Sequence, residues 1–215
     1  MPAIDSPALA LHRSGLVEYE QALAVQRSIH AEVAAGSRNN TLILLEHPSI
    51  YTAGKRTLDE ERPGNGAKVL DVDRGGKITW HGPGQLVGYP IVRLSNPHEL
   101  VGFVREIEAG LIGVCSEFGI NGVRVAGRSG VWVVDEKGER KVAAIGIRVA
   151  SGTSMHGFAL NVNPDLSAFD AIVPCGISDA AVTSFERELG RTITIEEVTP
   201  IVEKYLYEAL TKVSV

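Results

Sequence analysis

Hydrophobic residues recur with a helical period in three parts of the chain. We predict helices from residue 16 to 35, from Pro97 to about Phe118, and from about Ile195 to Lys212. Glycine follows the first two segments, as is typical of helix ends, and Thr194 precedes the third as a candidate N-cap. The buried face of the first helix is expected to include Leu16, Tyr19, Leu23, Gln26, Ile29 and Val33.

Shorter apolar or alternating runs predict β-strands, most of them in the middle of the chain. A loop rich in glycine and proline is expected between the second and third strands, and residues 136–138 supply a turn between the fourth and fifth. This order of elements predicts an α+β layered domain with a mixed or antiparallel sheet. The expected strands are 41–46, 68–73, 89–94, 130–135, 141–150 and 155–163.

Chain length and composition narrow the class of protein. A chain of 215 residues can bury about 70% of its surface, which predicts a single domain over residues 1–215. Two cysteines exclude a disulfide framework and favour a reducing compartment. The longest apolar runs reach about six residues, against the roughly 20 that a membrane helix needs. The first 15 residues do not resemble a signal peptide, so we expect a cytoplasmic protein without membrane segments.

Charge is distributed unevenly along the chain. The net charge of −5 argues against general nucleic-acid binding, which depends on neutralising phosphates. Residues 74–148 nevertheless carry ten basic and seven acidic side chains, whereas the remainder carries eleven and nineteen. Two explanations account equally well for this uneven distribution of charge. One is chance scatter of solvated side chains, and the other is that the middle third faces an anionic partner.

Residues 74–90, RGGKITWHGPGQLVGYP, contain five glycines and two prolines. Such a segment is an ordinary loop in many proteins, but glycines also let the backbone approach a ligand closely. Six polar or aromatic side chains between the glycines favour a ligand site. The segment is neither a Walker A loop nor a GxGxxG fingerprint, so these rules indicate no nucleotide site. The six are Arg74, Lys77, Thr79, Trp80, His81 and Gln85.

The two cysteines lie in different surroundings. Cys115 is among apolar residues of a predicted helix, which is typical of a buried structural thiol. Cys175, in VPCGIS, is flanked by proline and glycine and fits a tight loop. A nucleophilic thiol needs a nearby cation, because a pKa of about 8.5 leaves only a small fraction of thiolate at pH 7. The candidate cations are Lys141, His81 and His156, although each alone is also explained as an ordinary strand-end lysine or structural histidine.

Other familiar catalytic patterns are missing from the sequence. There is no CxxC, HxxxH or HExxH spacing, which argues against a metal site. There is no GxSxG elbow, so serine hydrolysis has no local support.

Several segments together resemble one family, the lipoyl(octanoyl) transferases of lipoate biosynthesis. They are LLEHPSIYTAGKR, RGGKITWHGPGQLVGYP, GRSGVWV, KVAAIGIRV, HGFALNVN and VPCGI, and the resemblance covers about residues 10–190 in order. The RGGxxTxHGPGQ block and the later PCG are the most specific parts. Trp80 stands where another aromatic residue, Tyr or Phe, is expected.

The resemblance implies the mixed sheet with packed helices that lipoate and biotin protein ligases share. It implies an acyltransferase that moves an octanoyl group from octanoyl-acyl carrier protein to a lysine of a lipoyl domain. The acceptors would be lipoyl domains of 2-oxoacid dehydrogenases and glycine cleavage H proteins. No cofactor or metal is implied, and exchange between thioesters needs no ATP.

The resemblance also assigns roles to residues. Cys175 would be the nucleophile that forms an acyl-thioester enzyme, and Lys141 would lower the pKa of its thiol and shuttle protons. Backbone N–H groups of the PCG segment or of residues 141–146 are alternative donors to the oxyanion. The expected acyl-binding residues are Arg74, Gly75, Gly76, Lys77, Ile78, Thr79, Trp80, His81, Ala144, Ile145, Gly146, Gly157, Phe158 and Ala159.

Two other functions compete with this assignment. A lipoate or biotin protein ligase would use ATP and need no catalytic cysteine, so Cys175 and the HGPGQ block favour the transferase. A non-catalytic acyl-binding or carrier-binding module would not need both Cys175 and Lys141.

Overall fold

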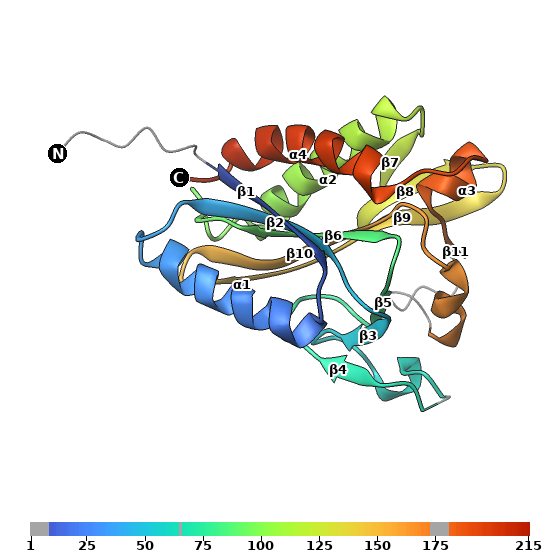
Figure 1. Cartoon of the computed structure of the whole chain (residues 1–215), viewed down its shortest axis with the longest axis horizontal. Coiled ribbons are helices and arrows are strands. Elements are labelled where there is room, and N and C mark those ends of the chain that lie inside the picture. The colour runs from blue at the N-terminus through green and yellow to red at the C-terminus, as the bar shows by residue number, and fades with distance from the viewer. Residues whose placement is uncertain (1–8, 65, 173–180) are drawn as a thin grey trace.

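The computed structural model describes residues 9–64, 66–172 and 181–215, which form a mixed sheet with helices on both faces (Figure 1). In this part of the chain the main sheet has eight strands in the order β1-β2-β6-β10-β9-β8-β7, with β11 paired to β9. Two pairs, β1 with β2 and β11 with β9, are parallel, and the others are antiparallel. The strands are β1 (Leu9–Leu16), β2 (Asn40–Glu46), β6 (Gln85–Ile91), β7 (Gly122–Val125), β8 (Arg128–Asp135), β9 (Gly138–Ala150), β10 (Thr153–Asn161) and β11 (Ala181–Val182).

A second, three-stranded sheet packs beside the first. Its order is β4-β3-β5, from β3 (Ile50–Ala53), β4 (Val69–Asp71) and β5 (Thr79–His81). Two 3₁₀ helices lie at Asp59–Glu61 and Leu166–Ala171, and the latter contacts β5. This small sheet therefore brings the glycine-rich residues 74–84 toward the main sheet.

Helices cover opposite faces of the main sheet (Figure 1). Helix α1 (Tyr19–Ala34) contacts β10 and β6 on one face. Helices α2 (Leu100–Glu117) and α4 (Ile195–Thr211) pack against each other over the other face, and short α3 (Phe185–Leu189) lies near its end. Apolar side chains alternate between a larger core beneath α2 and α4 and a smaller one beneath α1.

Cys115 belongs to the larger core. Its side chain is fully buried, and this burial raises the pKa of the thiol to about 12. A thiol with that pKa is not a nucleophile at neutral pH, which confirms the interpretation of Cys115 as a packing residue.

The α+β architecture with a mixed sheet is confirmed, but several boundaries differ from the sequence prediction. Leu16 ends β1 rather than starting a helix, and α1 begins at Tyr19. Strand β1 was not predicted. It lies at the edge of the sheet and most of its residues are exposed, so its sequence shows no clear alternation of apolar and polar residues. The short strands β3, β5 and β7 were also missed, β5 because it lies inside the glycine-rich segment.

The remaining elements lie close to the predicted positions. Helix α2 starts at Leu100, three residues later than expected, and β6 starts at Gln85, four residues earlier. Thr194 caps α4 as predicted, since its hydroxyl accepts a hydrogen bond from the Glu197 N–H at 3.3 Å. In the described ranges no helix is both long and apolar enough to cross a membrane.

Candidate active site

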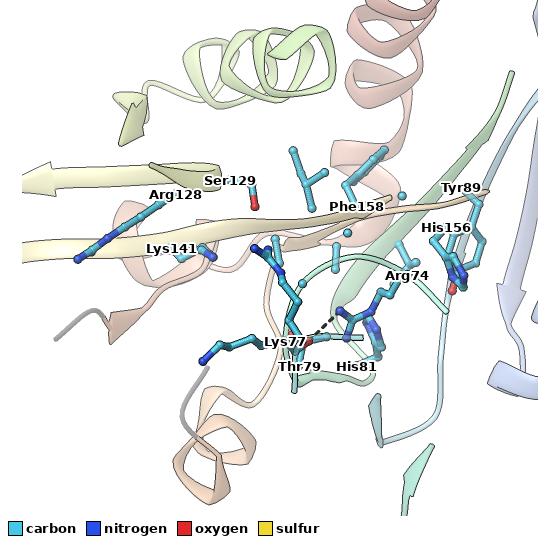
Figure 2. Close-up of a pocket in the computed structure, with 18 of the residues that line it drawn as sticks. Arg74, Lys77, Thr79, His81, Tyr89, Arg128, Ser129, Lys141, His156 and Phe158 are labelled. Carbon is cyan, nitrogen blue, oxygen red and sulfur yellow. Dashed lines mark hydrogen bonds between the residues drawn. The ribbon is translucent and has the colours of Figure 1, made fainter. Parts of the chain in front are cut away.

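A cavity of about 250 Å³ lies between the small sheet and strands β9 and β10 of the main sheet (Figure 2). Lys141 and Arg128 lie toward one end, Tyr89 and His156 toward the other, and Arg74 between them. Twelve of the residues expected from sequence line it. They are Arg74, Gly76, Lys77, Thr79, His81, Lys141, Ala144, Ile145, Gly146, Gly157, Phe158 and Ala159.

A β-bulge directs Lys141 into this cavity. Between β8 and β9 the register shifts, so that Trp132 pairs with Lys141 but Val131 pairs with Ala143. Val142 and Ala143 consequently both join the core beneath α2 and α4, whereas Lys141 lines the cavity with Ala144. Regular alternation would have turned Lys141 toward that core.

Lys141 is therefore not an exposed strand-end lysine. Only 7% of its surface is exposed, and its Nζ lies 4.5 Å from the centroid of the Trp132 ring. At that distance the ring face attracts the ammonium group. A buried lysine beside a cavity is equipped to act on a bound ligand.

Gly130 supports this bulge, and we predict that Gly130→Ala destabilises the protein by about 2–4 kcal/mol. Its N–H donates to Glu108 Oε1 at 2.9 Å, its φ is +112°, and an added Cβ would lie 2.4 Å from the carbonyl oxygen of Ala143. Gly138→Ala is the matched control: φ is +96° but no atom lies within 4 Å, so we expect about 1 kcal/mol. Denaturant unfolding measures both, and equal costs would contradict this role of Gly130.

Glycines pack closely around the side chain of Arg74. Its guanidinium donates to the Thr52 carbonyl at 2.7 Å and to the Lys77 carbonyl at 2.8 Å, and only 7% of the residue is exposed. A Cβ on Gly54 would lie 2.7 Å from Arg74 Nη1, and one on Gly146 would lie 3.0 Å from Arg74 Cδ. The glycines thus make room for a buried, hydrogen-bonded cation at the cavity wall.

A chain of hydrogen bonds joins the HGPGQ block to the strand that carries Lys141. His81 Nδ1 bonds Gln85 Oε1 at 2.8 Å, and Gln85 Nε2 donates to Asn161 Oδ1 at 2.9 Å. Asn161 Nδ2 then donates to the Thr183 carbonyl, and the Thr183 N–H donates to the Lys141 carbonyl, both at 2.9 Å. The glycine-rich segment, Lys141 and the chain just after residue 180 are therefore held in fixed relative positions.

The buried histidines are neutral at neutral pH. Burial lowers the pKa of His81 to about 3 and that of His47 to about 4. Burial also lowers the pKa of His156, although its Nε2 bonds Asp73 Oδ1 at 2.7 Å. Of the three cations considered from sequence, Lys141 therefore remains as the one suited to stabilise a thiolate.

Three of the expected residues, Gly75, Ile78 and Trp80, do not line the cavity. Thr79 and His81 of β5 face it, so Trp80 between them faces the opposite way. Trp80 and Ile78 belong to a separate apolar cluster, in which the Trp80 ring centroid lies 5.5 Å from that of Phe169. The Gly75 N–H donates a hydrogen bond to the Ile147 carbonyl at 3.0 Å.

Cys175 lies outside the described residues, in the segment 173–180. The described residues on either side of this segment have defined neighbours in the fold. Ile172 is buried in the cluster around Trp80. Ala181 and Val182 pair in parallel with Arg140 and Lys141 of β9. The chain therefore resumes directly beside the backbone of Lys141.

Sequence reasoning missed several lining residues. Tyr19 was recognised only as part of a helix face, Arg56 only as part of the motif GKR, and Arg128 only as one of the basic residues of the middle third and of the motif GRSG. Nothing local in the sequence indicates that these residues converge, because they come from different elements. The missed lining residues are Tyr19, Arg56, Val87, Tyr89, Gly127, Arg128 and Ser129. His156, which the sequence suggested only as a cation near Cys175, lines the cavity as well.

Four of the ten basic residues in the middle third of the chain, residues 74–148, line the cavity. Arg74 and Lys141 are buried in its wall, and Lys77 and Arg128 also line it. Arg148 is paired with Asp73 instead. These four side chains place positive charge where a ligand would bind, and the other six lie elsewhere.

Comparison with known proteins identifies the family. The model of the lipoyl protein ligase A/B catalytic domain matches residues 18–207. An octanoyltransferase of Salinispora tropica is 58% identical over 203 residues, covering 94% of this chain and 95% of the relative. One of Acidothermus cellulolyticus is also 58% identical, covering 94% and 92%.

Solved structures share the fold at low sequence identity. A crystal structure of lipoate-protein ligase A bound with ATP has a TM-score of 0.74 at 18% identity, covering 94% of this chain and 85% of the other. Biotin protein ligase from Aquifex aeolicus has a TM-score of 0.52 at 14% identity, covering 95% and 68%. The fold expected from the resemblance is therefore confirmed.

Proposed function

Since the chain belongs to the lipoyl protein ligase A/B catalytic domain family, we propose how it transfers an octanoyl group: through a thioester on Cys175, with Lys141 beside it. The octanoyl transfer itself, a step in protein lipoylation, follows from 58% identity to octanoyltransferases over most of the chain. The observation that carries the proposal is the bulge that turns Lys141 into the cavity, next to the strand that resumes after the Cys175 segment.

The octanoyl chain would lie along β9 and β10. Here the cross-strand pair Ala144 and Ala159 lines the cavity with small side chains, and the paired Gly146 and Gly157 line it as well. By the scale on which a cavity of about 150 Å³ accommodates benzene, the volume has room for roughly eight to ten carbons. Burial of seven carbons beyond the carbonyl is worth roughly 5–6 kcal/mol, which is available for binding and chain-length selection.

The first step would acylate the enzyme. The Cys175 thiolate attacks the thioester carbon of the donor, the bond to the donor sulfur breaks, and the donor thiolate leaves and takes up a proton. One thioester replaces another, so the step is nearly thermoneutral and needs no ATP. The Lys141 ammonium would favour the attacking thiolate, and lowering the thiol pKa by about two units takes about 2.7 kcal/mol.

The second step would transfer the chain to the acceptor. The ε-amine of the acceptor lysine attacks the Cys175 thioester, the C–S bond breaks, and an amide forms. Lys141 as a neutral amine would take the proton that the attacking nitrogen loses. Splitting the reaction lets each protein partner dock separately.

The partners follow from this chemistry. The donor would be octanoyl-acyl carrier protein and the acceptors lipoyl domains, including those of 2-oxoacid dehydrogenases and glycine cleavage H proteins. The whole chain, residues 1–215, would act as one catalytic domain, because the family match extends over residues 18–207.

An assay without ATP tests this proposal against the ligase alternative. We expect the purified protein to transfer octanoyl from octanoyl-acyl carrier protein to a lipoyl domain in buffer that contains neither nucleotide nor added metal. Intact mass of the lipoyl domain measures the product, and a lipoyl domain with its target lysine replaced is the control. An absolute requirement for ATP would contradict the proposal.

A further inference from the structure

Helix α2 carries a carboxylate on the face that packs against the sheet. Glu108 is fully buried, and its neighbours on that face, Ile107 and Leu111, are apolar. Burying a carboxylate costs free energy unless cations or N–H groups surround it. Apolar side chains often replace a buried ion pair without loss of stability. The contacts of the carboxylate therefore indicate why a glutamate stands at this position.

Three donors from three elements surround this carboxylate. Arg105 of α2 donates to Oε2 of Glu108 at 2.6 Å, and Arg124 of β7 donates to the same oxygen at 3.1 Å. The other oxygen, Oε1, accepts the Gly130 N–H of β8 at 2.9 Å. Both arginine side chains are partly exposed, whereas Gly130 is buried. One carboxylate oxygen is thus used by two cations near the surface, and the other by the backbone of β8.

Gly130 lies where the hydrogen-bond ladders of β8 are interrupted. The register toward β7 shifts between Val123 and Val125, and the register toward β9 shifts directly after Val131. Within these described strands neither ladder pairs Gly130 with a residue of the neighbouring strand. A buried N–H without an acceptor destabilises the folded protein. Glu108 Oε1 therefore supplies the acceptor that the sheet does not provide.

The Gly130 backbone lies against the side chain of Lys141. A Cβ placed on Gly130 would lie 3.5 Å from Lys141 Cε and 2.4 Å from the Ala143 carbonyl oxygen. The two residues before it, Arg128 and Ser129, line the same end of the cavity as Lys141 (Figure 2). A displacement of Gly130 would therefore move both the cavity wall and the aliphatic stem that carries the Lys141 ammonium group.

We propose that Glu108 is a positioning residue for octanoyl transfer, which holds the Gly130 backbone in place and thereby sets where the Lys141 ammonium lies. The inference rests on the proposed function, because it concerns the lysine that acts on the thiol. Glu108 does not line the cavity. Its effect passes through two contacts, from Oε1 to the Gly130 N–H and from Gly130 to the Lys141 stem. An ion pair that served stability alone would need only the contacts of Oε2.

Glu108→Gln tests the proposal, because the two side chains have the same shape. The amide has one acceptor oxygen, and two guanidinium groups attract it more strongly than one backbone N–H does. The NH₂ group then faces the Gly130 N–H, which loses its acceptor. We expect acylation of the enzyme at pH 7 to slow about tenfold, with KM for the donor changed less than about threefold. An unchanged acylation rate would contradict the proposal.

The pH profile of Cys175 separates positioning from stability. If the Lys141 ammonium moves away from the thiol, the thiolate forms at higher pH. Alkylation of Cys175 by iodoacetamide, followed by peptide mass, should therefore reach its midpoint at higher pH in Glu108→Gln than in the parent protein. A smaller fraction of folded enzyme would leave that midpoint where it is. An unchanged midpoint is thus evidence of a merely structural role and refutes the proposal.

Arg105→Gln is the matched control for the ion pair. It removes one partner of Oε2 but leaves Arg124 and the bond to Gly130 in place. Denaturant unfolding should show that both variants are destabilised, because each weakens a buried ion pair. The acylation rate of Arg105→Gln should nevertheless stay within about twofold of the parent rate, since the contact with Gly130 remains. Equal slowing in the two variants would show that Glu108 acts only through stability.

A double-mutant cycle shows whether Glu108 acts through Lys141. Glu108→Gln should slow acylation about tenfold in the parent protein but less than about twofold in a Lys141→Ala background, where the positioned group is already absent. A tenfold loss in both backgrounds would overturn the proposal. If Lys141→Ala alone leaves acylation unchanged, the proposed function has failed instead, so the cycle distinguishes the two failures.

Discussion

Replacing Cys175 with alanine is expected to reduce octanoyl transfer by at least about a thousandfold, because the variant has no nucleophile to carry the acyl group. The residual rate would be that of direct attack by the acceptor lysine on the bound donor. Transfer to a lipoyl domain, followed by intact mass, measures the loss. Circular dichroism and denaturant unfolding check that the fold is unchanged.

Cys115→Ala is the control that the chain itself offers. Its thiol is buried in the core beneath α2 and α4, with a pKa raised to about 12. The variant should keep the transfer rate and lose only about 1 kcal/mol of stability, the cost of a small cavity. Retained transfer in Cys175→Ala, or an equal loss in Cys115→Ala, would contradict the proposed mechanism.

Replacing Lys141 with alanine is expected to slow both half-reactions by about 10²–10⁴-fold at pH 7. Without the cation, the pKa of the Cys175 thiol should return toward about 8.5, so little thiolate is present. Acylation of the enzyme should therefore recover as the pH is raised toward 9. Transfer to the acceptor lysine should recover less, because the base is also missing.

Two further variants separate charge from proton transfer. Lys141→Arg keeps a positive charge but cannot release a proton, so it should retain much of the acylation rate and little of the transfer rate. Lys137→Ala, which removes an exposed lysine from the turn between β8 and β9, should leave both steps unchanged. Single-turnover measurements of the acylation and the transfer half-reactions distinguish the two roles. Equal losses in both steps for Lys141→Arg would show that Lys141 positions the site instead.

Much of the fold was predictable from local patterns. The run from Thr41 to Glu46 is apolar because β2 is buried on both faces, and the structure places this strand within one residue of the prediction. Thr194 was identified as an N-cap because a hydroxyl before an acidic first turn satisfies free N–H groups. Strand β1 left no such signal, because its exposed edge carries mixed residue types.

The site was harder to predict, because it depends on contacts between distant segments. The cavity-facing position of Lys141 follows from a register shift opposite Val131 and Trp132, which no alternation within residues 141–150 reveals. The buried position of the Arg74 side chain requires glycine at 54 and at 146, two residues that are far apart in the chain. Arg56 could be named from its motif, but only the fold shows that it shares a cavity with Lys141.

The most direct test of the central claim is the intact mass of the enzyme after mixing with octanoyl-acyl carrier protein, without ATP and without acceptor. We predict that one octanoyl group is added per chain, that peptide mapping places it on Cys175, and that a lipoyl domain then removes it. Addition to another residue, or an octanoylated lipoyl domain formed with no acylated enzyme in a rapid-quench time course, would contradict the account.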